Sequence, residues 1–134
     1  MKHFFCQFPG SPDSLAQVAL FIQQGCQEAG LSGEFVENMV VIASEAVTNA
    51  IRYGTRWAGD LLAVTLEISA EYVALHVLDH GPGFDPELIP SPDLDDPSEG
   101  GYGIYIIKCL VDEVNYLRGD DANTMIMIKR ISLS

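Results

Sequence analysis

Two neighbouring runs of alternating apolar residues, 61–69 and 72–79, constrain the fold of this chain more than any other feature of its sequence. Alternation with a period of two is typical of a strand with one buried face. Because only Ala70 and Glu71 separate the runs, they predict a tight antiparallel hairpin. One face of each strand is apolar, formed by Leu62, Val64, Leu66 and Ile68 and by Val73, Leu75 and Val77. These faces need a layer of helices to cover them.

Two amphipathic helices precede the hairpin and can supply that layer. We expect the first helix to begin at Ser11 as its cap, with Pro12 at the first helical position, and to stop at Gly30. The second helix is expected over about residues 32–53, with Gly54 as its stop. Its broad apolar arc comprises Phe35, Met39, Ile42, Ala43, Ala46, Val47 and Ala50. Its polar arc, about 60° wide on ideal helix geometry, holds Asn38, Glu45, Asn49 and Arg52.

The remaining sequence adds three strands, one helix and a long loop. Residues 3–8, 113–118 and 124–131 are predicted strands, and residues 102–111 are a predicted helix. Residues 80–101 carry five of the seven prolines and many acidic residues, which indicates a lid loop. The element order predicts a single domain over residues 1–134 of the α+β class. We expect a two-layer α/β sandwich whose mixed, mainly antiparallel sheet carries three helices on one face.

Composition excludes several classes of partner. The 134 residues suit one domain, and a formal net charge of −12 disfavours nucleic acid, which recruits Lys and Arg. No run reaches the ~20 apolar residues of a membrane-spanning helix, so no membrane partner is expected. Cys6, Cys26 and Cys109 match no metal motif and cannot all pair within one chain. The sequence therefore predicts reduced thiols in a cytoplasmic protein.

Three short segments carry residues suited to ligand chemistry. Glu45 and Asn49 lie one turn apart on one helix face, where a carboxylate can accept a proton and an amide oxygen can bind Mg²⁺. Residues 79–85 place Asp79 at a strand end before a glycine turn. Residues 100–104 open a helix with glycines, where free N–H groups attract anions. Taken singly, these segments also fit a solvated stripe, a plain turn and a hinge, but their combination is far more specific.

These segments resemble the motifs of the GHKL superfamily of ATPases and kinases, which share the Bergerat fold. Residues 44–50 (SEAVTNA) resemble its N box, residues 79–83 (DHGPG) its first glycine box, and residues 101–103 (GYG) its second. The resemblance covers nearly the whole chain. Together with the short length, residues 44–54 resemble the anti-sigma factor serine/threonine kinases most closely.

The resemblance implies ATP and Mg²⁺ as ligands and assigns a role to each matching residue. Glu45 would be the catalytic base, and Asn49 would bind both the metal and the nucleotide. Asp79 would hold the adenine amino group. The remaining predicted contacts to the nucleotide are Arg52, Gly81, Gly83, Gly101, Tyr102, Gly103, Ile104 and Thr124. Because few basic residues lie nearby, Mg²⁺ and backbone dipoles would stabilise the phosphate charge.

The sequence and its family resemblance are compatible with three functions. The first is a kinase that phosphorylates an anti-anti-sigma (STAS-type) antagonist and sequesters a sigma factor, with a homodimer implied by the resemblance. The second is a nucleotide-gated binding module with little catalysis, favoured by acidic residues at 95–99, where many related kinases carry a basic residue. The third is a stand-alone ATPase domain like that of a histidine kinase, but no predicted helix supplies a phospho-accepting histidine.

Overall fold

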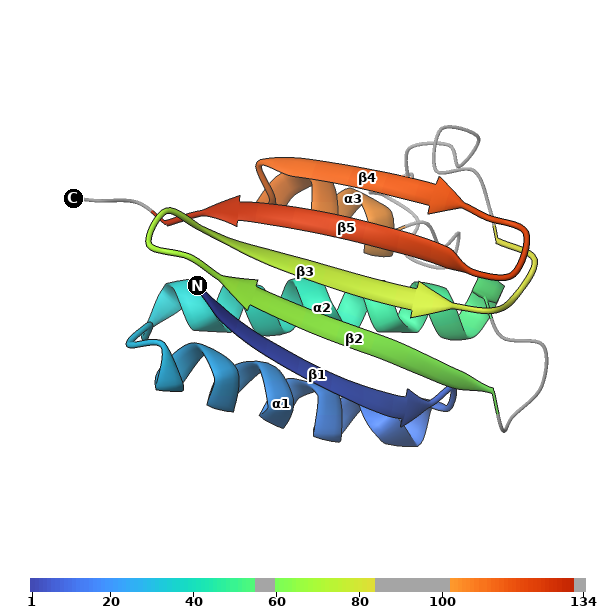
Figure 1. The fold of residues 1–134 in the computed structure, drawn as a ribbon, viewed down its shortest axis with the longest axis horizontal. Helices are drawn as coiled ribbons and strands as arrows, with labels where there is room; N and C mark the ends of the chain where they lie inside the picture. Colours follow the sequence, from blue (N-terminus) through green and yellow to red (C-terminus); the bar gives the residue numbers. More distant parts are fainter. Residues whose placement is uncertain (55–59, 84–101, 132–134) are drawn as a thin grey trace.

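The computed structural model describes residues 1–54, 60–83 and 102–131 and has two layers, a sheet and three α-helices that cover one of its faces (Figure 1). The α+β sandwich predicted from the sequence is thereby confirmed. The elements in chain order are β1 (Lys2–Pro9), the short 3-10 helix η1 (Pro12–Ser14), α1 (Leu15–Glu28), α2 (Glu34–Gly54), β2 (Leu61–Ile68), β3 (Tyr72–Asp79), α3 (Tyr102–Leu110), β4 (Glu113–Arg118) and β5 (Asn123–Arg130).

The described strands form one sheet in the order β1-β2-β3-β5-β4. All four neighbouring pairs are antiparallel, so the expected mixed sheet contains no parallel pair among the described residues. The predicted hairpin of β2 and β3 is present, with Leu66 opposite Leu75. The last strand, β5, lies between β3 and β4, and this order places Asn123 directly opposite Asp79.

The core lies between the helices and the inner face of the sheet. The predicted apolar faces of β2 and β3 are buried, and so are the central residues of α1 and the predicted arc of α2, apart from half-buried Phe35. The largest fully buried side chains include Ile22, Met39, Ile42, Leu62, Leu66 and Leu75. Each such side chain stabilises the fold by about 1.5–3 kcal/mol relative to an exposed one. Burial on this scale fixes α2 against the sheet and so fixes the direction of its polar arc.

The first helical segment begins as predicted but is divided into two parts. Ser11 caps η1, since its side-chain oxygen accepts a hydrogen bond from the Asp13 N–H at 3.3 Å. The Ser14 hydroxyl donates to the Pro9 carbonyl at 2.8 Å and ties η1 to the end of β1. The α-helix itself therefore begins only at Leu15, and Gly30 follows its end with a φ of 84°.

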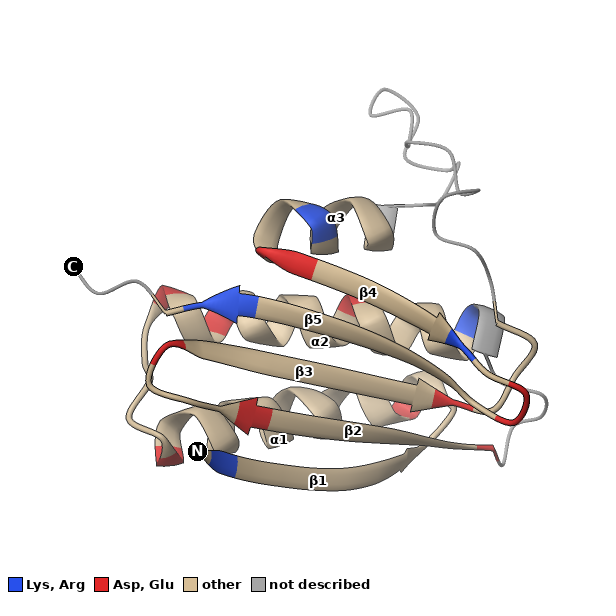
Figure 2. Ribbon diagram, turned by 45° about the horizontal axis from the view of Figure 1, so that its top comes forward, with Lys and Arg blue, Asp and Glu red and all other residues tan. Residues whose placement is uncertain are grey.

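Several element ends meet at one end of the molecule. Figures 1 and 2 both place the C-terminal part of α2, the end of β3 and the start of β5 toward this end, with the start of α3 facing it. The positively charged residue Arg52 lies in the last turn of α2, and Arg118 ends β4 (Figure 2).

Within the described ranges, no helix has both the length and the apolar character to cross a membrane.

Candidate functional site

The polar arc of α2 faces the beginning of α3. A side-chain carbon added to Gly103 would lie 3.0 Å from Oε2 of Glu45 and 3.6 Å from both amide atoms of Asn49. The two side chains lie four residues apart, so they project from neighbouring turns of one helix face. Any larger residue at position 103 would fill the space between the two helices, where the predicted base and the predicted metal ligand meet.

The Asn49 side chain has an unusual environment. It is 7% exposed, and its Nδ2 is the only buried side-chain nitrogen or oxygen in the described part of the chain that lacks a hydrogen-bond partner. Leaving such a group unpaired costs about 1–3 kcal/mol. The two amide atoms can be exchanged by a flip of the side chain, so either can be turned to a ligand. An amide oxygen is a good ligand for Mg²⁺, so the residues present fit this ion.

A second polar cluster surrounds Asp79 at the end of β3. One side-chain oxygen of Asp79, Oδ1, accepts hydrogen bonds from Asn123 Nδ2 at 2.9 Å and from the Gly81 N–H at 3.2 Å. Asn123 Nδ2 also donates to the Gly81 carbonyl at 2.9 Å. Asp79 and Asn123 are 3% and 2% exposed, so this cluster is buried at one end of the sheet.

Burial raises the pKa of the Asp79 carboxyl above its ordinary value of 3.8, because an ionised carboxylate loses solvation there. The hydrogen bonds from Asn123 and Gly81 and the charge of His80 lower this pKa, whereas the charge of Asp60 raises it. The carboxylate is thus held by donors that favour its charged form. In that form it accepts hydrogen bonds, as contact with an amino group requires.

The glycine turn after Asp79 wraps closely around Asn123. Gly83 has a φ of 77°, and a side-chain carbon there would lie 2.9 Å from Oδ1 of Asn123. Both the left-handed backbone and the close approach require glycine at this position. The turn is further held by Arg118, whose guanidinium donates to the Pro82 carbonyl at 3.3 Å. A ring nitrogen of His80 lies 3.1 Å from the Asp121 carbonyl oxygen.

The structure places the other predicted site residues in different ways. Ile104 is buried in α3, and Arg52 is exposed in the last turn of α2. Tyr102 begins α3, whereas Gly101 and most of the predicted lid, residues 84–101, lie outside the described residues.

Thr124 is not brought to the Asp79 cluster. Asn123, Met125 and Met127 are buried on the inner face of β5, so alternation puts half-buried Thr124 on the outer face, opposite Leu78 of β3. Asn123, which was not among the predicted contacts, takes the inner position instead. Asn123 begins β5, one residue before the predicted strand 124–131. Its inner position depends on the pairing of β5 with β3, which the sequence does not show.

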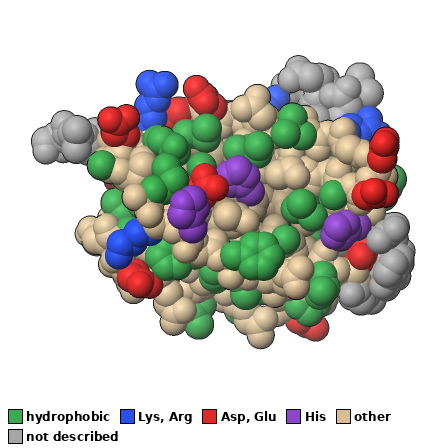
Figure 3. Space-filling model, in the orientation of Figure 1, with side chains coloured by type: hydrophobic (Ala, Val, Ile, Leu, Met, Phe, Trp, Pro, Cys, Tyr) green, Lys and Arg blue, Asp and Glu red, His purple; other side chains and the backbone are tan. Residues whose placement is uncertain are grey.

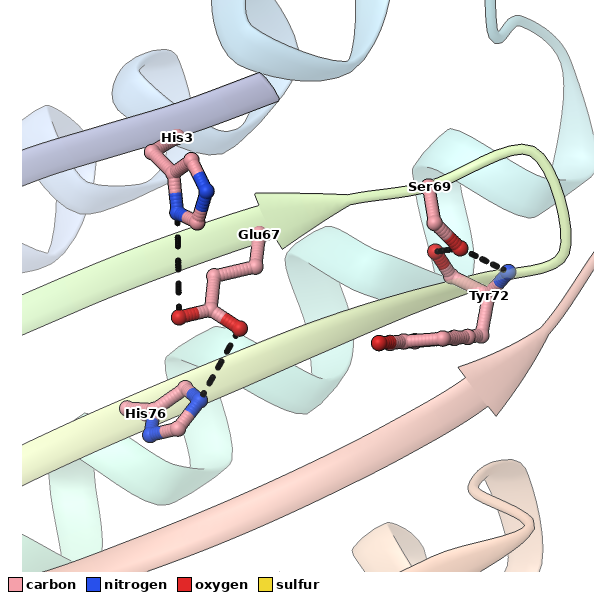
Figure 4. A network of polar contacts seen from close by, with 5 residues as sticks. All are labelled: His3, Glu67, Ser69, Tyr72 and His76. Carbon is pink, nitrogen blue, oxygen red and sulfur yellow. Dashed lines mark hydrogen bonds and ion pairs between the residues drawn. The ribbon is translucent and has the colours of Figure 1, made fainter. Parts of the chain in front are cut away.

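The outer face of the sheet has a hollow of about 570 Å³, and none of its lining residues belongs to either cluster. Hydrophobic side chains and histidines are visible on this face (Figure 3). Glu67 lies between His3 and His76, with N···O distances of 3.7 Å to each ring (Figure 4). Such partly exposed pairs contribute about 0–1 kcal/mol. The helix-side clusters, with a buried unpaired amide, are the stronger candidate for a functional site.

Comparison with known proteins shows the family to which the chain belongs. The family of histidine kinase-like ATPase domains matches residues 8–129. The chain therefore belongs to this family.

Two similar proteins both bear the name serine-protein kinase RsbW. The protein from Oceanobacillus iheyensis is 26% identical, over 91% of this chain and 82% of its own length. The protein from Staphylococcus epidermidis is 28% identical, over 93% of this chain and 84% of its own length.

Solved structures show the same fold. The RsbU and RsbW domains of Rv1364c from Mycobacterium tuberculosis match with a TM-score of 0.73 at 17% identity, over 100% of this chain and 34% of that longer chain. The SiaB–SiaC complex from Pseudomonas aeruginosa matches with a TM-score of 0.64 at 10% identity, over 96% of this chain and 89% of the matched one. At these identities the likeness concerns the fold alone.

Proposed function

We propose that this chain is an ATP-dependent protein serine/threonine kinase of the anti-sigma type. It binds Mg-ATP and phosphorylates a serine or threonine of a STAS-type antagonist, and it sequesters a sigma factor when the antagonist does not occupy it. The kinase class is supported by two relatives named serine-protein kinase that align with more than nine-tenths of the chain. The homodimer implied by the family resemblance remains a prediction.

One observation carries the proposal: Glu45 and Asn49 face Gly103 together, and Asn49 has a buried amide nitrogen without a partner among the described residues. A carboxylate and an amide thus lie beside Gly103, which has no side chain to block a phosphate. A binding module without catalysis would need the amide and the glycine but not the carboxylate. The position of Glu45 therefore favours phosphoryl transfer over binding alone.

Each residue has a distinct task in the proposed reaction. The Glu45 carboxylate accepts the proton of the substrate hydroxyl while the hydroxyl oxygen bonds to the γ-phosphorus of ATP. The bond from that phosphorus to the β–γ bridging oxygen breaks, and ADP leaves with this oxygen. The amide oxygen of Asn49 would hold Mg²⁺, which neutralises charge on the phosphates. The N–H groups at the start of α3 would receive phosphate oxygens, and Asp79 would accept a hydrogen bond from the adenine amino group.

The test is phosphoryl transfer from ATP labelled in its γ-phosphate to STAS-type domains encoded in the same genome. We expect transfer by the wild type and at least about a hundredfold loss in Glu45→Gln, since a general base contributes 10²–10⁴-fold. Binding of ADP should remain. The matched control is Glu37→Gln, an exposed acid on the same helix, which should retain transfer. Nucleotide binding without transfer to any such domain would leave the gated binding module as the function.

A further inference from the structure

Asn123 and Asp79 form a buried pair at one end of the sheet. Asp79 is the last residue of β3 and Asn123 the first of β5, and the strand register sets them directly opposite each other. Both side chains are at most 3% exposed. A buried amide beside a buried carboxylate needs its polar atoms satisfied, so the hydrogen bonds of this pair define its geometry.

The Asn123 amide nitrogen has two hydrogens and uses them for two acceptors. One acceptor is Asp79 Oδ1 and the other is the Gly81 carbonyl, each at 2.9 Å. Because the Gly81 N–H also donates to Oδ1, both hydrogen bonds recorded for this carboxylate within the described residues go to the same oxygen. Neither of these hydrogen bonds uses the second oxygen, Oδ2, which can therefore accept a hydrogen bond from another donor.

The glycine turn fixes the amide in return. The Gly83 backbone approaches Asn123 so closely that a side-chain carbon on Gly83 would lie 2.9 Å from Oδ1 and 3.1 Å from Nδ2 of Asn123. The amide is therefore enclosed between β3, the turn and its own strand. A side chain held from three sides is suited to position a neighbour, because its rotamers are restricted.

We propose that Asn123 is a positioning residue that orients the Asp79 carboxylate so that Oδ2 accepts a hydrogen bond from the amino group of an adenine base. This inference rests on the proposed function, because it requires a nucleotide at Asp79. It also predicts base selectivity. An ionised carboxylate accepts a hydrogen bond from the 6-amino group of adenine, whereas guanine presents an acceptor oxygen at that position and is repelled.

The charged groups around Asp79 define what a pH profile should show. The donors Asn123 and Gly81 and the charge of His80 lower the pKa of Asp79, and burial and Asp60 raise it. Removing the Asn123 amide removes one of the lowering causes. In Asn123→Ala, the pKa of Asp79 should therefore rise, and binding of an amino-bearing base should begin to fail at a higher pH than in the wild type.

The experiment is titration of the full chain with Mg-ADP and Mg-GDP between pH 5 and 8. For Asn123→Ala we expect about tenfold weaker ADP binding, a smaller preference for ADP over GDP, and an acid limb displaced to higher pH. Asn123→Ser retains a shorter donor that reaches one acceptor at most. Its ADP affinity and base preference should therefore lie between those of the wild type and Asn123→Ala. The matched control, Asn115→Ala on the exposed side of β4, should leave all three quantities unchanged.

A measurement without nucleotide separates this inference from the proposed function. The carboxyl ¹³C resonance of Asp79, assigned with Asp79→Asn, should titrate at a higher pH in folded Asn123→Ser than in the wild type. An unchanged titration, or unchanged ADP affinity and selectivity in a wild-type-like Asn123→Ala, overturns the positioning role while the proposed function stands. Absence of ADP binding by the wild type overturns the proposed function, and the adenine-orienting role falls with it.

Discussion

Gly103 lies so close to Glu45 that a side-chain carbon on the glycine would come within 3.0 Å of the carboxylate oxygen Oε2. The same carbon would lie 3.6 Å from the Asn49 amide. This single relationship joins the motif on α2 to the motif at the start of α3, which are more than fifty residues apart in the sequence. It also shows why the space between the helices depends on the absence of a side chain.

Gly103→Ala should lower nucleotide affinity without lowering the stability of the fold. Alanine favours a helix over glycine by about 0.8–1 kcal/mol, and the crowded atom is the end of a flexible side chain that can move. The unfolding temperature should therefore stay equal or rise. Nucleotide affinity should fall at least about tenfold, because the space for phosphate is reduced and Glu45 is displaced. Thermal unfolding and ADP titration measure the two effects, with Cys109→Ala on the same helix as control.

Asp79→Asn should make the protein more stable at pH 7. Because burial raises the pKa of Asp79 above 3.8, the folded state binds this proton more tightly than the unfolded chain does. The stability linked to that proton is fully present below pH 3.8 and is lost as the pH rises through the folded pKa. The free energy of unfolding in urea should thus exceed that of the wild type at pH 7, and the difference should shrink toward pH 3.8.

The same variant should lose nucleotide binding, since an amide lacks the charge to attract the adenine amino group as strongly. The control Asp120→Asn, in the exposed β4–β5 turn, should change neither the free energy of unfolding nor the nucleotide affinity appreciably. Lower stability of Asp79→Asn at pH 7 would show that the carboxylate supports the fold itself rather than a ligand.

The cysteines should differ strongly in reactivity. Cys26 is fully buried, and burial raises the pKa of its thiol to about 11, so little thiolate forms. Cys109 is exposed on α3. A thiol-specific reagent at pH 8 should modify Cys109 rapidly in the native protein and Cys26 only after unfolding in urea, as mass spectrometry of peptides can show. Rapid native labelling of Cys26 would contradict the packing of α1 against the sheet.

The sequence was sufficient to predict elements whose signal is local. The β2–β3 hairpin followed from alternation and a two-residue connection, and the apolar arc of α2 followed from helical spacing. The partnership of Glu45 with Asn49 was local too, because both lie on one helix face. Their position beside Gly103 required the family resemblance, since no periodicity relates α2 to α3.

The role of Asn123 could not be predicted because it depends on pairing between distant strands. Sequence order gave no reason why β5 rather than β4 should lie beside β3. The prediction named Thr124 as a site residue, but a strand turns successive side chains to opposite faces, and the structure directs Asn123 inward. A shift of one residue therefore exchanges a half-buried position on the outer face for a buried one in the candidate site.

The most direct test is titration of the wild type and Asn49→Ala with ATP, in the presence of Mg²⁺ and of EDTA. It shows whether a metal-bound nucleotide lies between α2 and α3, at Glu45, Asn49 and Gly103. We predict that the wild type binds ATP more tightly with Mg²⁺ and that Asn49→Ala loses at least about tenfold in affinity with Mg²⁺ but little in EDTA. The exposed control Asn115→Ala should behave like the wild type. Equal ATP affinity of Asn49→Ala and the wild type with Mg²⁺, or no binding by either, would contradict a metal–nucleotide site at Asn49.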